Sequence, residues 1–93
     1  MRGDEEKAAL LSRLRRAKGQ LEGVERMIEE DRYCIDVLFQ LAAVRAALGK
    51  VAARMLEGHV KTCVAHAIAS GEVSERDEKI DEVLEVFSRF GTK

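Results

Sequence analysis

Proline and tryptophan are absent from this chain of 93 residues, and aromatic side chains make up only 4% of it. Sheet-rich domains draw on aromatic and β-branched residues, whereas Ala, Leu, Val, Glu, Arg and Lys dominate here, as is typical of long helices. The sequence therefore predicts an all-α fold in one small domain, residues 1–93. A chain this short leaves much apolar surface unburied when it folds alone, so a partner subunit is a natural source of additional core.

Long apolar runs are also missing. No stretch approaches the roughly 20 apolar residues that span a bilayer, and residues 1–6 lack the apolar core of a signal peptide. We therefore expect a cytoplasmic protein with no membrane partner. In that compartment Cys34 and Cys63, the two cysteines, are expected to be thiols or metal ligands rather than a structural disulfide.

The net charge of −1 conceals two basic stretches. Residues 10–20 hold four basic side chains and no acid, and residues 41–63 hold four basic side chains and one acid. A local basic patch attracts phosphate whatever the total charge, although a solvated helix face would have the same composition. The predicted contacts to DNA phosphates are Arg13, Arg16, Lys50 and Arg54. The reserve candidates are Arg15, Lys18, Arg45 and Lys61.

Three helices are predicted, at about residues 5–29, 32–70 and 74–90. The first carries a helix-bundle stripe with 4-3-4-3-4 spacing, which consists of Leu10, Leu14, Ala17, Leu21, Val24 and Ile28. Asp31 is expected to cap the second helix and Ser74 the third, while Ser70 and Gly71 are expected to end the second.

The second predicted helix has apolar residues on two faces, and both faces need cover. One face consists of Val37, Leu41, Val44, Leu48, Val51 and Met55. The other consists mainly of small residues, among them Ala42, Ala46, Gly49 and Ala53. An unbroken helix from Tyr33 to Ala69 would be roughly 55 Å long, more than the first helix can cover. We predict that the three-helix protomer forms an antiparallel dimer with a four-helix bundle, and that two dimers form a homotetramer.

His59 and Cys63 are four residues apart, so a helix presents both side chains on one face. Alone, this pair is weak evidence for a metal site, because buried cysteines and isolated histidines are common. Cys34 lies roughly 37 Å before His59 along a helix and cannot join the pair within one chain. In an antiparallel pair of second helices, however, Cys34 of one protomer comes level with His59 and Cys63 of the other.

The centre of that pairing lies near Ala47 and Leu48, where Gly49 would allow close backbone approach. The resulting ligand set of two thiolates and one imidazole favours Cu(I), because Zn(II) normally takes a fourth ligand. His66 is the side chain that could supply a fourth ligand. No acid, base and nucleophile converge as a catalytic set, and no glycine-rich phosphate loop is present. We expect neither enzymatic activity nor a small-molecule substrate.

Three segments make the chain resemble the CsoR/RcnR-type repressors over essentially its whole length. They are RLRRAKGQLEG at residues 13–23, DRYC at 31–34 and HVKTCV at 59–64. The resemblance implies a mostly helical protomer, an antiparallel dimer, and a disc-like dimer of dimers that binds operator DNA without a helix-turn-helix. It also implies that ligand binding weakens DNA binding.

Members of this family are distinguished by four sensing positions. The last three read Cys34, His59 and Cys63 here, which is similar to the copper branch; the first falls on Arg2, where nickel- and cobalt-sensing members have a histidine. In the copper branch a tyrosine before the first cysteine and a glutamate in the third helix link the metal-bound histidine to the bundle. By this resemblance the tyrosine is Tyr33, and the glutamate is either Glu75 or Glu78.

The favoured hypothesis is a repressor that binds operator DNA without metal and is released by Cu(I). A second hypothesis is a thiol redox or persulfide sensor that uses Cys34 and Cys63 across the dimer. Persulfide sensors of this family lack the histidine that corresponds to His59. The remaining alternatives are a sensor of another transition metal and a helical interaction module without a ligand.

Overall fold

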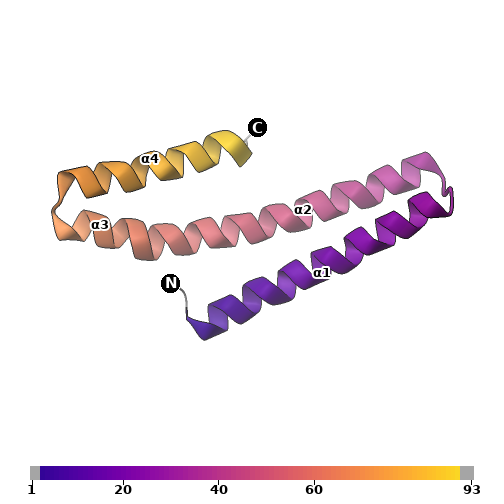
Figure 1. Ribbon diagram of the computed structural model, residues 1–93, viewed down its shortest axis with the longest axis horizontal. Coiled ribbons are helices and arrows are strands. Elements are labelled where there is room, and N and C mark those ends of the chain that lie inside the picture. The colour runs from indigo at the N-terminus through magenta and orange to yellow at the C-terminus, as the bar shows by residue number, and fades with distance from the viewer. Residues whose placement is uncertain (1–2, 91–93) are drawn as a thin grey trace. The chain divides into compact units, whose positions relative to one another are not determined.

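The computed structural model describes residues 3–90, which form helices and turns without a strand. The elements are α1 (Asp4–Glu29), α2 (Cys34–His59), the π-helical segment η1 (Val60–Val64), α3 (Ala65–Ser70) and α4 (Val73–Phe90) (Figure 1). The prediction of an all-α fold is confirmed. Within the described range, no helix is both long enough and apolar enough to span a bilayer.

The second predicted helix consists of three segments in succession, because α2 continues into η1 and η1 into α3 without a break. It begins at Cys34, two residues later than expected. The first predicted helix begins at Asp4 and the third at Val73, each one residue earlier than expected. The chain divides into two compact units, Met1–Arg54 and Met55–Lys93.

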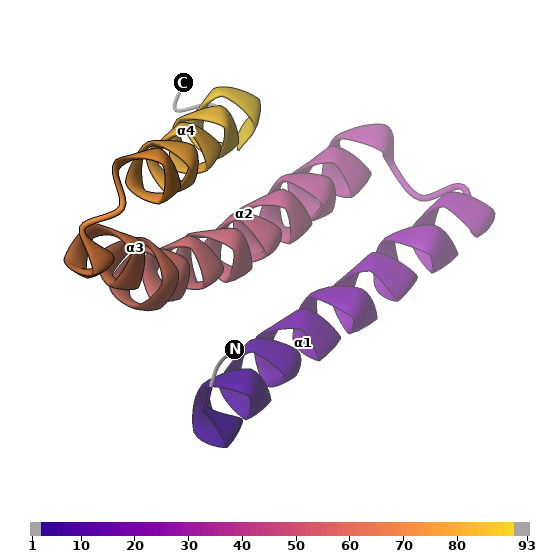
Figure 2. The ribbon, with the colours of Figure 1, turned by 60° about the vertical axis from the view of Figure 1, so that its left-hand side comes forward.

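In the first unit, α1 and the part of α2 up to Arg54 run side by side in opposite directions (Figures 1 and 2). Every seventh residue is buried on both helices: Leu10, Ala17 and Val24 on α1, and Val37, Val44 and Val51 on α2. Val24, Val37 and Val44 form one cluster, and Met27 packs against it. Buried apolar residues recur every seven positions where two helices pack lengthwise against each other, as in coiled coils.

The residues between these buried positions stay exposed on the same stripes. Leu14, Leu21 and Ile28 on α1 are 44%, 50% and 59% exposed, and Leu41 and Leu48 on α2 are 39% and 43% exposed. The helical hairpin thus covers one row of its apolar seam and leaves the neighbouring row in contact with solvent.

The turn after α1 contradicts the predicted role of Asp31. This residue has a φ of 55°, and its N–H donates to the Ile28 carbonyl at 3.1 Å. The next N–H, that of Arg32, donates to the Met27 carbonyl at 2.9 Å. Such a pair of bonds around one left-handed residue ends a helix, and Asp tolerates the left-handed conformation better than most residues. Asp31 therefore ends α1 and does not cap α2, which begins only at Cys34.

In the second unit, α4 packs against η1 and α3. Val64 and Ala67 are the buried residues of this unit's described part. On α4, Ile80, Leu84 and Phe87 are 38%, 59% and 48% exposed. This unit therefore also presents an apolar row that the described protomer leaves partly uncovered.

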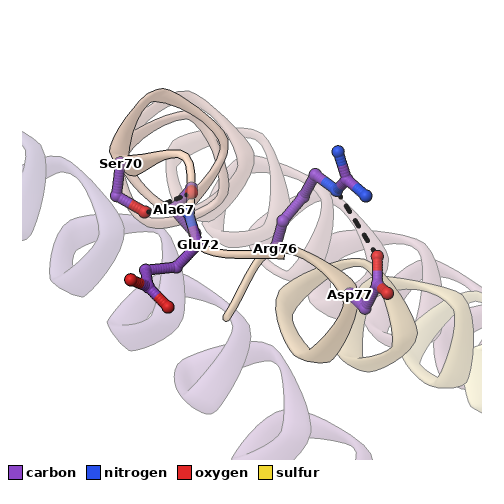
Figure 3. Close-up of polar contacts among 5 residues, drawn as sticks. All are labelled: Ala67, Ser70, Glu72, Arg76 and Asp77. Atoms are coloured by element: carbon purple, nitrogen blue, oxygen red, sulfur yellow. Dashed lines mark hydrogen bonds and ion pairs between the residues drawn. The ribbon is translucent and has the colours of Figure 1, made fainter. Parts of the chain in front are cut away.

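The end of α3 is as predicted. Gly71 follows the helix with a φ of 81°, a left-handed conformation that costs glycine little. The Ser70 hydroxyl donates to the Ala67 carbonyl at 2.7 Å and accepts the Glu72 N–H at 3.2 Å (Figure 3). Ser70 and Gly71 together stop the helix and turn the chain.

The start of α4 differs from the prediction. The Arg76 N–H donates to the Glu72 carbonyl at 2.9 Å, so the helix begins directly after Glu72. Ser74 is the second residue of α4 and is not its cap. The side chain of Arg76 makes a separate contact: its Nε donates to Oδ1 of the neighbouring Asp77 at 3.4 Å (Figure 3).

Candidate metal centre and nucleic-acid interface

His59 and Cys63 both fall in the second unit, four positions apart across the junction of α2 and η1. His59 is the last residue of α2 and is half-buried, and Cys63 is an exposed free thiol inside η1. Between them the backbone is π-helical, with hydrogen bonds that span five residues instead of four. Short π-helical stretches inside α-helices are frequent at functional sites, because the wider turn redirects side chains. This change of backbone was not predicted.

The Cys63 sulfur has one polar neighbour among the described residues. The Thr62 hydroxyl oxygen lies 3.7 Å from Sγ, and it donates its proton to the Gly58 carbonyl at 2.7 Å. A hydroxyl has one proton, so the shorter bond to Gly58 uses it. The sulfur lone pairs of Cys63 are therefore available to an incoming ligand from the solvent side.

Cys34 and Tyr33 lie at the opposite end of α2, in the first unit. Cys34 is the first residue of the helix and is an exposed free thiol, and the Tyr33 side chain is 68% exposed. Among residues 3–90 of one protomer, no three His, Cys, Asp or Glu side chains gather in a way that could hold a metal ion. His59 and Cys63 fall in the second unit and Cys34 in the first, and the role of all three as metal ligands stays a prediction.

His66 and Arg2 are the two remaining residues for which the sequence raises a role in sensing. His66 is exposed in α3, three residues after Cys63, and its role as a fourth ligand stays a prediction. Arg2 lies outside the residues that the structure describes.

The two predicted glutamates, Glu75 and Glu78, lie in the first two turns of α4. Glu75 is half-buried and Glu78 is exposed. They share a shallow acidic hollow with five other residues: Ser74, Asp77, Asp81, Glu82 and Glu85. Although α4 packs against η1, no hydrogen bond joins either glutamate to His59 in the described part of the chain. Their link to the histidine stays a prediction.

Three of the four predicted DNA contacts are exposed. Arg13, Arg16 and Lys50 have no acidic partner within residues 3–90. Arg54 is different, because its guanidinium donates to the Glu6 carboxylate at 3.1 Å. The role of Glu6 was not foreseen, because nothing in the sequence links residues 48 positions apart.

The reserve candidates also separate into two groups. Arg15, Lys18 and Arg45 are exposed without an acidic partner in the described range. Lys61 forms an ion pair with Glu57, one helical turn away, at 3.2 Å.

These features describe a small helical chain with a histidine and a free thiol four positions apart and with exposed basic side chains on its helices. A family model described as metal-sensitive transcriptional repressor matches residues 6–89. The chain belongs to this family, whose members are regulators and not enzymes.

Individual relatives agree with this assignment. Over 89 residues, 96% of this chain and 85% of the relative, the sequence is 44% identical to the copper-sensing transcriptional repressor CsoR of Bacillus subtilis. The solved structure of the copper-sensing repressor CsoR with Cu(I) from Geobacillus thermodenitrificans matches with a TM-score of 0.88 at 40% identity. That match covers 97% of this chain and 91% of the other.

The fold alone does not select the metal. The nickel-responsive transcriptional regulator InrS matches with a TM-score of 0.74 at 38% identity, over 90% of this chain and 91% of that one. A nickel-responsive and a copper-sensing protein therefore share the fold of this chain. The choice of ligand has to be argued from its own side chains.

Proposed function

We propose that this protein is a Cu(I)-sensing transcriptional repressor, which binds operator DNA in the metal-free state and leaves it when Cu(I) binds. The observation that carries the proposal is the pairing of the half-buried His59 with the exposed thiol of Cys63 on one stretch of helix. Relatives named copper-sensing repressors support it. In keeping with this role, we place the protein in the cytoplasm.

The proposed metal site is shared between two protomers. His59 and Cys63 would supply an imidazole and a thiolate, and Cys34 of the partner subunit would supply a second thiolate. Soft sulfur ligands in low number favour Cu(I) over Zn(II), which usually takes four ligands. When bound, the ion would supply a crosslink between helices of two chains. The protein's own part is to hold three donors at the correct separation.

The proposed assembly is an antiparallel homodimer that associates to a homotetramer. On the helical hairpin, the uncovered row of Leu14, Leu21, Ile28, Leu41 and Leu48 continues the repeat of the buried row. A second hairpin placed on this row would complete a four-helix bundle. The exposed apolar row on α4 supports further association of dimers.

The proposed DNA contact uses phosphates rather than a helix inserted into the major groove. Arg13, Arg16 and Lys50 are exposed and free of acids within the described residues, so their full charge is available to displace counterions. Arg54 would join them after leaving Glu6. A metal that binds the DNA-free form more tightly must weaken operator affinity by the same factor.

A thiol switch is the second candidate function, because Cys34 and Cys63 are both free and exposed. A two-electron oxidant could join the two thiols in a disulfide across the dimer, and a small-molecule persulfide could do the same while it is reduced to a thiol and sulfide. A His59→Ala variant separates the functions, since a thiol switch needs only the two sulfurs whereas the copper switch is expected to need the imidazole.

The experiment that tests the proposal compares ligands on one DNA. Release of metal-free protein from its operator is followed by fluorescence anisotropy while Cu(I), Zn(II), Ni(II) or persulfide is added. Release at about one Cu(I) per protomer, at lower concentration than with the other additions, is the expected result. Release from the operator by persulfide and by none of the metal ions would show that the protein is a thiol switch and not a copper sensor.

A further inference from the structure

Glu6 and Arg54 form the ion pair that ties the open end of the helical hairpin together. The Arg54 guanidinium lies 3.1 Å from the Glu6 carboxylate, and the two side chains are 39% and 33% exposed. The other ion pairs within residues 3–90 join side chains at most four positions apart on one helix or turn. The Glu6–Arg54 pair joins α1 to α2 across 48 positions.

The surroundings of this pair favour it over a fully exposed ion pair. Its side chains are less exposed than those of Lys61 and Glu57, which are 72% and 63% exposed. Partly buried charges are less screened by salt than fully exposed ones. Glu6 also lies in the first turn of α1, where the helix dipole favours negative charge.

The same pair involves one of the four predicted DNA contacts, and the other three carry no acidic partner in the described chain. A guanidinium that already faces a carboxylate has its charge largely neutralised, so it displaces fewer counterions from DNA. To contact a phosphate, Arg54 can turn away from Glu6, which breaks the ion pair. Alternatively the pair stays intact, and the Glu6 carboxylate then lies near the phosphate and repels it. Either event opposes DNA binding.

We propose that Glu6 is a built-in competitor of DNA: it holds Arg54 in an ion pair and thereby lowers the affinity of the repressor for its operator. This inference rests on the proposed function, because it requires Arg54 to contact DNA. It adds a residue that sets how tightly the metal-free protein binds. A weaker resting complex is also more easily dissociated by an effector of given coupling energy.

The test measures DNA affinity of Glu6→Gln against a matched control, Glu5→Gln. Glu5 precedes Glu6 in the same helical turn, is exposed and has no ion pair within the described residues, so both variants remove one acid from the same helix end. The probe is a fluorescent duplex selected by the metal-free parent from a random-sequence pool, titrated between 50 and 200 mM salt. Circular dichroism and sedimentation confirm that each variant folds and assembles as the parent does.

Glu6→Gln is expected to bind several-fold more tightly than Glu5→Gln, with a log–log salt slope steeper by roughly 0.9. Glu6→Asp keeps the charge at the helix end and shortens the reach to Arg54, so a smaller increase is expected. In an Arg54→Gln background Glu6→Gln is expected to have no larger effect than Glu5→Gln, because the part of its effect that exceeds net charge acts through Arg54.

Several outcomes would overturn the inference. Equal DNA affinity of Glu6→Gln and Glu5→Gln would show that any gain in affinity comes only from the loss of one negative charge. Weaker binding by folded Glu6→Gln would make the pair a support of the DNA-binding surface. Parent affinity in Arg54→Gln, together with a loss in Arg13→Gln, would remove Arg54 from the interface while the repressor function stands. Failure of the parent to select any duplex would instead refute the proposed function itself.

Discussion

Val44 and Leu48 lie one helical turn apart on α2, yet Val44 is 5% exposed and Leu48 is 43% exposed. α1 covers the first and leaves the second open. A single exposed leucine is ordinary, but Leu48 belongs to a row of exposed leucines with Leu41, Leu14 and Leu21, and extended exposed apolar patches mark interaction surfaces. We take this contrast as the main structural support for a dimer built on the hairpin.

Leu48→Ala is therefore expected to weaken association by at least tenfold, because each dimer loses two buried leucine side chains and such truncations cost about 2–5 kcal/mol when fully buried. Gln40→Ala, at an exposed polar position of the same helix, is the control and is expected to change stability by no more than about 0.5 kcal/mol. Sedimentation equilibrium over a concentration series measures both. A folded Leu48→Ala variant that associates as the parent does would exclude this row from the interface.

Gly49 provides an independent test of the dimer centre. A Cβ added at Gly49 would meet nothing within 4 Å in the protomer, and the same holds at Gly19 on α1. In a helix both Gly→Ala changes should stabilise the protomer by about 1 kcal/mol. If two α2 helices approach closely near Leu48, Gly49→Ala is expected to weaken the dimer, whereas Gly19→Ala should leave it intact. Thermal unfolding with sedimentation distinguishes the cases, and equal stabilisation by both changes would contradict a close approach at Gly49.

Subunit mixing tests whether the metal site is shared between protomers. Cys34→Ser and Cys63→Ser are each expected to lose tight Cu(I) binding and to remain on DNA in the presence of copper. In a mixed dimer, however, one of the two symmetry-related sites should be complete, because each proposed site takes Cys34 from one chain and His59 with Cys63 from the other. Random mixing should therefore restore about a quarter of the parent's Cu(I) capacity. Capacity that stays at zero after subunit exchange would indicate sites within single protomers.

Salt dependence tests the DNA-binding surface. Arg13→Gln is expected to flatten the log–log slope of operator affinity against salt by roughly 0.9, since one phosphate neutraliser is lost. Arg89→Gln is the control, because Arg89 is exposed on α4 and pairs with Glu85 at 3.0 Å. An unchanged slope for Arg13→Gln would assign this arginine to a solvated helix face.

The sequence predicted the helices well and their ends less well. Apolar periodicity fixes where a helix must exist, and the observed α1 (Asp4–Glu29) begins within one residue of the expected start. Helix ends depend on the local turn: Asp31 adopts the left-handed conformation that ends α1 instead of capping α2. Ser74 likewise falls inside α4, because the Glu72 carbonyl already accepts the first helical bond.

For the site, only the local part was accessible from the sequence. His59 and Cys63 could be paired because helical geometry alone relates positions four apart. The π-helical backbone between them has no comparable sequence signal. The Glu6–Arg54 pair depends on how two helices pack, which spacing within either helix does not reveal. Cys34 stays a predicted ligand, because its partners are expected on another chain.

The coupling of metal to DNA is the central claim, and His59 is the residue on which it depends. Without the imidazole, the two proposed thiolate ligands, Cys34 and the partner's Cys63, are expected to hold copper still. The helix junction at η1, however, would no longer be tied to the metal. A hundredfold regulatory effect needs roughly 2.7 kcal/mol of preference for the DNA-free form, and we expect most of that preference to require His59.

The most direct measurement is the operator affinity of His59→Ala with and without one equivalent of Cu(I) per protomer, beside the parent under the same conditions. The account predicts that the parent loses affinity by about a hundredfold on adding Cu(I), whereas His59→Ala binds copper but loses much less. Release of His59→Ala by copper as complete as that of the parent would contradict the assignment of His59 as the coupling ligand.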